Sequence, residues 1–335
     1  MYIPQAVLSA GAQRFGASGD DIHFLGGGGP GAGGVVYRFS RDGTEWTLKF
    51  MPGGDEATRS NDEKLGFVRY LAGRGVSVAC PQPSINGHLS EVVISGQDSF
   101  IVSSENLVPG HLTNMRNPAE WNEAFFFRWG HLIGRTHECT VNYPLWRKAD
   151  SQTPQEPPTQ IHDWSDEWRS FDEWCQEDAI RERWHEILNN LAKLPVERDS
   201  YGMIHNDPHP WNILVEGSRL TLIDFEVAGY HWFMMDLGIA TYAALCLAKP
   251  EPRVDFNQYT VAFLQSFLSG YRSAYKLDSY WLQQLPTFLS YRRILLFIVM
   301  YEETKKHPAQ LNRWREMILK DEPIIPSGIT LQWPE

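Results

Sequence analysis

Three oxygen-bearing side chains occur at short spacing in the second half of the chain. Asp207 and Asn212 lie five positions apart in His-Asn-Asp-Pro-His-Pro-Trp-Asn, and Asp224 follows twelve positions later in Leu-Ile-Asp-Phe-Glu. Two apolar runs, 213–215 and 220–223, flank a Glu-Gly-Ser turn, which predicts a β-hairpin between Asn212 and Asp224. Such a hairpin allows the three side chains to converge.

Phosphoryl transfer requires this combination of groups. A carboxylate accepts the proton of the attacking hydroxyl, while carboxylate and amide oxygens hold the Mg²⁺ ions that bridge the nucleotide phosphates. We therefore predict Asp207 as the catalytic base and Asn212 and Asp224 as metal ligands. A metal cluster of His205, Asp207 and His209 is the alternative. The prolines on both sides of His209 and the matching Asp224 favour the first interpretation.

Length and composition restrict the class of protein. The chain has 335 residues, 42% of them hydrophobic, and 41 acidic against 30 basic side chains give a net charge of -11. This length predicts two domains or one large two-lobed domain of an ordinary globular protein. No cluster of Lys and Arg offers a nucleic-acid backbone its counter-charge, so we expect no nucleic-acid partner.

The cysteines and the apolar runs indicate a cytoplasmic protein with no membrane partner. The four cysteines are far apart and form no Cys-x-x-Cys pair, so we expect reduced thiols rather than disulfides or a zinc site. The N-terminus lacks a basic start followed by a sustained apolar stretch, as a signal peptide would have. The longest apolar run, 294–301, is far shorter than the about 20 residues of a membrane span.

The predicted secondary structure changes from mainly β to mainly helical at about residue 105. Before it, the apolar runs 35–39 and 46–50 are joined by Asp42-Gly43, which predicts a hairpin, and helical spacing recurs over 61–73. After it, helical patterns dominate, and a Pro-rich polar stretch over 150–158 predicts an exposed loop. The predicted helices of this half cover 121–139, 164–194, 256–275 and 281–301.

The stretch around Asp207 resembles a known family. His-Asn-Asp-x-x-x-x-Asn followed by Ile-Asp-Phe is similar to the His-Gly-Asp-x-x-x-x-Asn loop and Ile-Asp-Phe segment of the aminoglycoside phosphotransferase and choline kinase superfamily. The Asp-Pro-His-Pro-x-Asn wording and the run 230–237 resemble bacterial homoserine kinase type II-like small-molecule kinases. The resemblance implies an α+β, protein-kinase-like two-lobed fold, with a β-rich N-lobe over 1–105 and a helical C-lobe over 106–335. It also implies an ATP- and Mg²⁺-dependent kinase that phosphorylates a small-molecule hydroxyl.

The N-lobe contains the elements that this resemblance requires. Gly29, Gly31 and Gly34 fit Gly-x-Gly-x-x-Gly-x-Val, in which glycines let backbone amides approach phosphate oxygens. A run so rich in glycine is equally typical of a flexible linker. Lys49, on the following predicted strand, corresponds to the lysine that binds the α- and β-phosphates, and its alternative is an exposed strand lysine.

Two further groups follow from the resemblance. Glu63, on the predicted helix 61–73, is the expected carboxylate partner of Lys49, with Asp62 and Glu56 as alternatives. The hinge that binds the adenine edge corresponds to 101–110, with backbone contacts from Glu105 and Leu107. A strand that simply leaves its sheet through Pro-Gly would have the same sequence.

Three positions in the second half need separate interpretation. Asn206 occupies the position where the family has glycine, and we expect it to affect loop geometry more than chemistry. Glu226 is either a substitute metal or substrate ligand or an ordinary surface glutamate. Asp236 is expected to support the catalytic loop through hydrogen bonds.

The sequence predicts only the chemical class of the acceptor substrate. The net charge of -11 favours an amine-bearing alcohol, a hydroxy amino acid or an aminoglycoside-like compound. Aromatic residues over 230–233 and at Trp164, Trp168, Trp174 and Trp184 either line a cation-binding pocket or belong to the core. Two alternatives stay open: a protein Ser/Thr kinase, against which the missing Ala-Pro-Glu segment argues, and a catalytically silent nucleotide-binding protein.

Overall fold

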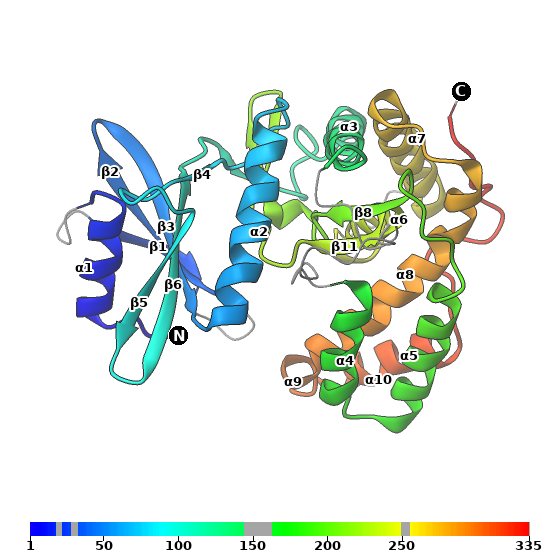
Figure 1. Cartoon of the computed structure of the whole chain (residues 1–335). Coiled ribbons are helices and arrows are strands. Elements are labelled where there is room, and N and C mark those ends of the chain that lie inside the picture. The colour runs from blue at the N-terminus through cyan, green and yellow to red at the C-terminus, as the bar shows by residue number, and fades with distance from the viewer. Residues whose placement is uncertain (18–21, 28–32, 144–162, 249–254, 335) are drawn as a thin grey trace, which may run out of the picture. The chain divides into compact units, whose positions relative to one another are not determined.

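The chain is described by a computed structural model that covers residues 1–17, 22–27, 33–143, 163–248 and 255–334 (Figure 1). These residues form two compact units. The first contains the described residues of Met1–His111 and Leu214–Val227, and the second contains the rest. The lobe boundary predicted at residue 105 thus lies a few residues before His111, where the N-terminal part of the first unit ends. The return of the chain to the first unit over 214–227 is a feature that the sequence did not predict.

The first unit is built on one antiparallel sheet with the order β1-β2-β3-β6-β4, in which β5 also pairs with β6. The predicted hairpin is confirmed as β2 and β3, whose turn uses positive φ angles at Asp42 (53°) and Gly43 (73°). Lys49 lies opposite Val36 on one side and Ser103 on the other. The strands are β1 (His23–Gly27), β2 (Val35–Arg41), β3 (Thr44–Pro52), β4 (Pro81–Gln82), β5 (Ser90–Ser95) and β6 (Asp98–Asn106).

Two helices accompany this sheet, where the sequence predicted one. Helix α1 (Gln5–Arg14) packs so closely on the sheet that a Cβ on Gly11 would lie 2.6 Å from the Phe50 ring. Helix α2 (Asp55–Ala72) begins before the predicted start, and acidic residues in its first turn suit the positive end of the helix dipole. Figure 1 shows α2 as a long helix beside the sheet.

A second hairpin completes the first unit. Strands β9 (Ile213–Glu216) and β10 (Arg219–Leu222) are joined by a turn with Gly217 at φ 59°. Leu222 forms a parallel bridge with Val78, and the Phe225 ring lies edge-on to Phe67 of α2 at 6.3 Å. These contacts hold the Asp224 segment in the first unit. The short strand β7 (His111–Leu112) marks the passage to the second unit.

The second unit is mainly helical and contains a small antiparallel sheet of β8 (Tyr201–Ile204) and β11 (Gly229–Trp232). Helices α3 and α7 are in close contact because a Cβ on Gly130 or Gly270 would lie 1.9 Å from a backbone oxygen of the facing helix. The predicted helix 164–194 is two helices that separate at Cys175. The helices are α3 (Glu123–Thr140), α4 (Trp164–Trp174), α5 (Asp178–Leu191), α6 (Phe233–Tyr242), α7 (Phe256–Ala274), α8 (Ser279–Val299), α9 (Tyr301–Thr304) and α10 (Pro308–Leu319).

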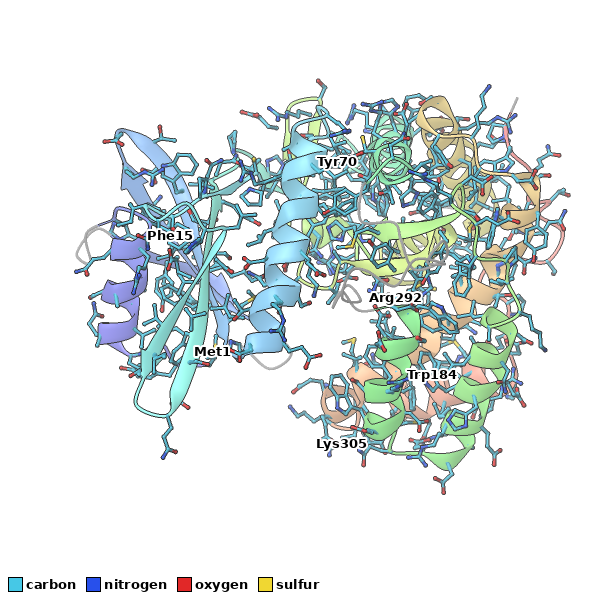
Figure 2. All side chains as sticks on the ribbon, in the orientation of Figure 1. Met1, Phe15, Tyr70, Trp184, Arg292 and Lys305 are labelled. Atoms are coloured by element: carbon cyan, nitrogen blue, oxygen red, sulfur yellow. The ribbon has the colours of Figure 1, made fainter. Side chains whose placement is uncertain are left out.

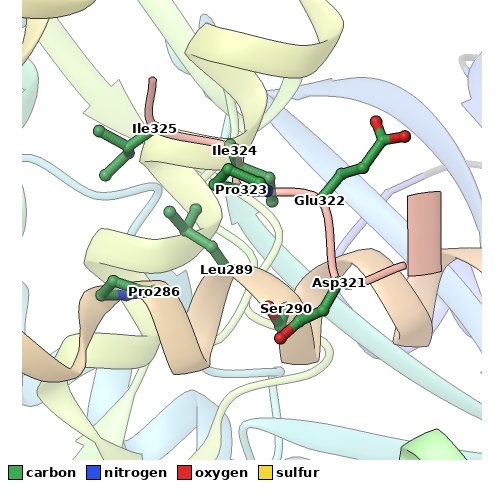
Figure 3. A pocket seen from close by; sticks show the side chains of 8 residues that line it. All are labelled: Pro286, Leu289, Ser290, Asp321, Glu322, Pro323, Ile324 and Ile325. Atoms are coloured by element: carbon green, nitrogen blue, oxygen red, sulfur yellow. The ribbon is translucent and has the colours of Figure 1, made fainter. Parts of the chain in front are cut away.

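A small cavity lies between α8 and the segment that follows α10 (Figure 3). It has a volume of about 180 Å³ and is lined by Pro286, Leu289 and Ser290 on one side and by residues 321–325 on the other. The four cysteines are free thiols, as predicted. No helix in the described part of the chain is both long and apolar enough to cross a bilayer. The predicted loop 150–158 lies outside the described residues.

Candidate active site

The loop after β8 carries the predicted base. Asn206 adopts a positive φ of 65°, a left-handed conformation that asparagine tolerates better than most residues. The Asp207 amide then donates to His205 Nδ1 (3.2 Å), and Trp129 Nε1 donates to the Pro208 carbonyl (3.0 Å). Asn212, at the end of a short 3-10 helix, donates from Nδ2 to the Asp207 carbonyl (3.0 Å). Its amide oxygen is therefore left as a potential metal ligand.

Asp236, in the first turn of α6, anchors this loop through hydrogen bonds to its carboxylate. Its carboxylate accepts the amides of His205 (3.3 Å) and Asn206 (2.8 Å) and lies 3.1 Å from His137 Nε2. Because the carboxylate can only accept, His137 donates from Nε2, which leaves Nδ1 to accept from the Tyr271 hydroxyl at 2.9 Å. This buried chain agrees with the predicted supporting role of Asp236.

The Asp207 carboxylate lies between two nitrogen groups of its own unit. Arg292 Nη2 of α8 lies 2.6 Å from Oδ1, and His209 Nε2 lies 3.2 Å from Oδ2. Burial on its own would raise the pKa of Asp207, but Arg292 and His209 hold it well below the ordinary value. Asp207 is therefore a carboxylate at neutral pH, which a proton acceptor must be.

Two residues near the base escaped the sequence analysis. Glu167 of α4 accepts a hydrogen bond from Asn206 Nδ2 and one from the Tyr291 hydroxyl (3.4 Å). Asn206 thus supplies a side-chain contact that glycine lacks. The other missed residue is Arg292. No local signal identifies either residue, because their partners are distant in sequence.

The first unit contains the predicted lysine, Lys49, and one of the two predicted metal ligands, Asp224. Lys49 Nζ lies 2.8 Å from Asp224 Oδ1 and 2.7 Å from Glu226 Oε2. Burial would lower the pKa of Lys49, but the two carboxylates raise it above its ordinary value. Lys49 is a permanent cation here, and Glu226 is one of its partners rather than an ordinary surface glutamate.

The expected ion pair between Lys49 and Glu63 does not form. The carboxylates at Lys49 come from the segment after β10, and α2 contributes Lys64, whose Nζ donates to the Glu226 carbonyl at 2.6 Å. Asp62, one of the alternatives, accepts a hydrogen bond from Ser90 instead.

Glycines near Lys49 allow the backbone to come close. A Cβ on Gly34 would lie 3.0 Å from Lys49 Cε and 2.9 Å from the Phe50 carbonyl. A Cβ on Gly33 would lie 1.4 Å from Glu226 Oε1, so a side chain at this position would displace the Glu226 carboxylate. The other two predicted glycines, Gly29 and Gly31, lie outside the described residues.

The predicted hinge lies at the end of β6. The Leu107 amide donates to the Glu45 carbonyl (3.1 Å), so an adenine contact from Leu107 would have to use its carbonyl oxygen. The Glu105 carbonyl accepts from Thr47 Oγ1 (3.2 Å). Burial raises the pKa of the half-buried Glu105 side chain to about 7, against the opposing attraction of Lys49.

Comparison with known proteins identifies the class. The model of the phosphotransferase enzyme family matches residues 29–275. Amicoumacin kinase of Bacillus subtilis (strain 168) is 30% identical over 309 residues, which are 90% of this chain and 86% of the relative. Homoserine kinase of Rhizobium meliloti (strain 1021) is 24% identical over 266 residues, 78% of this chain and 72% of the relative.

Solved structures have the same architecture. An amicoumacin kinase in complex with AMP-PNP and Ca²⁺ superposes with a TM-score of 0.85 at 26% identity, covering 97% of this chain and 96% of that one. A microcompartment-associated aminopropanol kinase gives a TM-score of 0.70 at 20% identity, covering 98% of this chain and all of that one, and it supports the fold alone.

Fold and site together define a protein-kinase-like phosphotransferase with a β-rich N-terminal part and a helical C-terminal part. It is a kinase that phosphorylates a small-molecule hydroxyl. The chain belongs to the phosphotransferase enzyme family.

Proposed function

We propose that this protein transfers the γ-phosphoryl group of MgATP to a hydroxyl of a small, amine-bearing molecule, with Asp207 as the base. The observation that carries this proposal is the state of Asp207. It lies in a loop that Asp236 and Trp129 anchor, and its carboxylate stays ionised between Arg292 and His209. A hydroxyl placed at Asp207 has an oriented proton acceptor.

The donor groups of the chain fit the nucleotide and its metal. A Cβ on Gly34 would meet the Phe50 carbonyl at 2.9 Å, and one on Gly33 would displace the Glu226 carboxylate. Glycine at both positions leaves this backbone free of side chains, which lets amides approach phosphate oxygens. The described residues contain no group of three His, Cys, Asp or Glu side chains able to hold a metal by themselves. Asn212 and Asp224 suit a Mg²⁺ ion that completes its coordination with phosphate oxygens and water.

Each residue then has a distinct task. Asp207 orients the acceptor hydroxyl and takes its proton as the new bond to phosphorus forms. Lys49 binds the α- and β-phosphates, and Glu226 restricts the position of Lys49 at 2.7 Å. Bound to Asn212 and Asp224, the metal ion would neutralise charge on the β- and γ-phosphates.

The net charge of the protein and the substrates of its relatives both support an acceptor that carries an amine. A net charge of -11 attracts cations over long range. The two curated relatives named above act on amicoumacin and homoserine, according to their names. We therefore expect 1-amino-2-propanol to be a better acceptor than 1,2-propanediol, which lacks the amine.

The test is ADP release from MgATP with amicoumacin, 1-amino-2-propanol, homoserine, choline and an aminoglycoside. Asp207→Ala should lose at least about 10²-fold in kcat, because general-base catalysis contributes about 10²–10⁴-fold. The matched control is Asp199→Ala, which removes an exposed aspartate of the same unit and should turn over normally. Unchanged turnover in Asp207→Ala would remove Asp207 as the base.

Metal use has its own readout. Titration calorimetry of ATP in the presence and absence of Mg²⁺ should show that Asp224→Ala weakens only the metal-dependent part of binding. Wild-type affinity of the variant for MgATP would contradict a metal role for Asp224. Phosphorylation of protein acceptors, with none of the small molecules, would indicate a protein kinase instead.

A further inference from the structure

Two adjacent arginines of α8 are both buried but have different partners. Arg293 donates from Nη1 to the carbonyls of Met317 (3.3 Å) and Glu322 (2.5 Å), and so secures the segment that lines the cavity in Figure 3. Among the described residues, Arg292 contacts only Asp207 through a polar atom, from Nη2 at 2.6 Å. Arg293 is thus a structural residue, whereas Arg292 is directed at the base.

Most donors of Arg292 have no acceptor in the described part of the protein. A guanidinium has five N–H donors, and the Arg292 side chain is only 9% exposed. Buried cations are normally paired and hydrogen-bonded throughout, because removing them from water is costly. The remaining donors of Arg292 therefore fit an oxygen-rich anion that enters the site with the substrates.

Neighbouring contacts hold this part of α8 in place. The Tyr291 ring stacks on Trp184 at 4.8 Å, and its hydroxyl donates to Glu167. Arg292 and Trp184 both lie in the second unit (Figure 2). Arg292 is thus a preorganised donor, which is the kind of group that stabilises charge in a transition state.

Distances from Asp207 limit where the transferred group can be. The acceptor hydroxyl must approach the Asp207 carboxylate to about 3 Å for proton transfer. Since Nη2 lies 2.6 Å from Oδ1, a hydroxyl that approaches Oδ1 has its reacting oxygen within roughly 6 Å of Arg292 Nη2. A phosphoryl group bonded to that oxygen has its nonbridging oxygens near the open donors.

We propose that Arg292 is a catalytic residue that binds the nonbridging oxygens of the phosphoryl group during its transfer. In this step the acceptor oxygen forms a bond to the γ-phosphorus, and the bond between that phosphorus and the ADP oxygen breaks. The electron pair leaves with ADP, and the hydroxyl proton passes to Asp207. Arg292 stays protonated throughout and stabilises the charge on the phosphoryl oxygens.

This inference rests on the proposed function, and the kinetic test uses an acceptor that the wild type phosphorylates. Arg292→Gln should lower kcat at least about 10²-fold while the acceptor KM stays within about threefold, since an arginine at the phosphoryl group contributes 10³–10⁵ in related chemistry. Arg292→Lys should recover part of the loss, and added guanidinium ion should partly rescue Arg292→Ala. Arg293→Gln is the matched control. It should lower the melting temperature and leave kcat unchanged.

A second measurement requires no acceptor. Aluminium fluoride with MgADP mimics a phosphoryl group in transfer, and its binding is measured by calorimetry on the folded variants. Wild type and Arg293→Gln should bind aluminium fluoride and MgADP together at least tenfold more tightly than Arg292→Gln, with MgADP alone bound equally.

The two measurements separate the possible failures. Equal binding of the mimic by wild type and Arg292→Gln would overturn the proposal, as would an unchanged or raised kcat. A higher KM with unchanged kcat would make Arg292 an acceptor-binding residue and would also overturn it. If the wild type phosphorylates no acceptor, the proposed function fails, and the binding of the mimic still decides the role of Arg292.

Discussion

Protonation of His231 should destabilise the second unit at mildly acidic pH. His231 lies on β11 with no exposed surface, and its Nδ1 accepts the Trp232 amide at 2.9 Å. Its Nε2 is buried without a hydrogen-bond partner among the described residues. Burial lowers the pKa of His231 from 6.5 to about 3, because an imidazolium here would lose its hydration.

The sign and size of the effect follow from proton linkage. Between pH 6.5 and about 3 the unfolded chain binds a proton at His231 that the folded chain does not, so stability falls as the pH falls. Each pH unit well below 6.5 costs about 1.4 kcal/mol. From pH 7.5 to pH 5.0 the expected loss of unfolding free energy from this group is about 2 kcal/mol.

Tryptophan fluorescence can follow this transition in urea. Every tryptophan in the described part of the chain except Trp46 belongs to the second unit, so their fluorescence reports mainly on that unit. His231→Phe should lose some stability at every pH, because the Trp232 amide loses its acceptor. Its stability should nevertheless fall about 2 kcal/mol less than that of wild type between pH 7.5 and 5.0.

The control for this experiment is His307→Gln, which removes an exposed histidine of the same unit. We expect it to follow the wild-type pH dependence far more closely than His231→Phe does. Identical pH dependence of wild type and His231→Phe would refute the reasoning, because His231 would then titrate alike in the folded and unfolded chains.

Three further predictions concern backbone geometry and the nucleotide side. Gly130→Ala should lower the melting temperature, since its Cβ would lie 1.9 Å from the Phe267 carbonyl; a higher value, as helix propensity alone would give, contradicts the α3–α7 packing. In urea denaturation, Asn206→Ala should have a free energy of unfolding about 1 kcal/mol lower than Asn206→Gly, because only glycine tolerates a φ of 65° freely. The reverse order of stability would exclude this backbone strain. Gly33→Ala and Glu226→Ala should change the calorimetric affinity for MgATP by the same factor, because the added methyl displaces the Glu226 carboxylate; unequal effects would separate the two residues.

The parts of the site that depend on local sequence could be predicted. The hairpin around Asp42-Gly43 and the one before Asp224 are fixed by turn residues between apolar runs. The position of Lys49 on a strand could be predicted because Lys49 lies within the first of these hairpins. The roles of Asp207 and Asn212 also rest on spacing within one loop, and they stay predictions for the kinetic tests above.

The parts that depend on distant contacts could not be predicted. Arg292 meets Asp207 across 85 positions of sequence, and nothing in its own helix distinguishes it from Arg293. The family pattern predicts Glu63 as the partner of Lys49, whereas the observed partner, Glu226, depends on tertiary packing that the spacing within a helix does not show. Helix α1 differs from these cases: its apolar residues recur with helical spacing, and this signal was overlooked.

The return of 214–227 to the first unit affects how this enzyme can be recombined with relatives. The segment that carries Asp224 and Glu226 belongs to the first unit but begins at Leu214, whereas the preceding described part of that unit ends at His111, with part of the second unit in between. A hybrid protein made with one crossover near residue 105 would combine the Lys49 of one parent with the two carboxylates of the other. Exchanging acceptor specificity while keeping one parent's nucleotide side therefore requires further junctions on both sides of this hairpin.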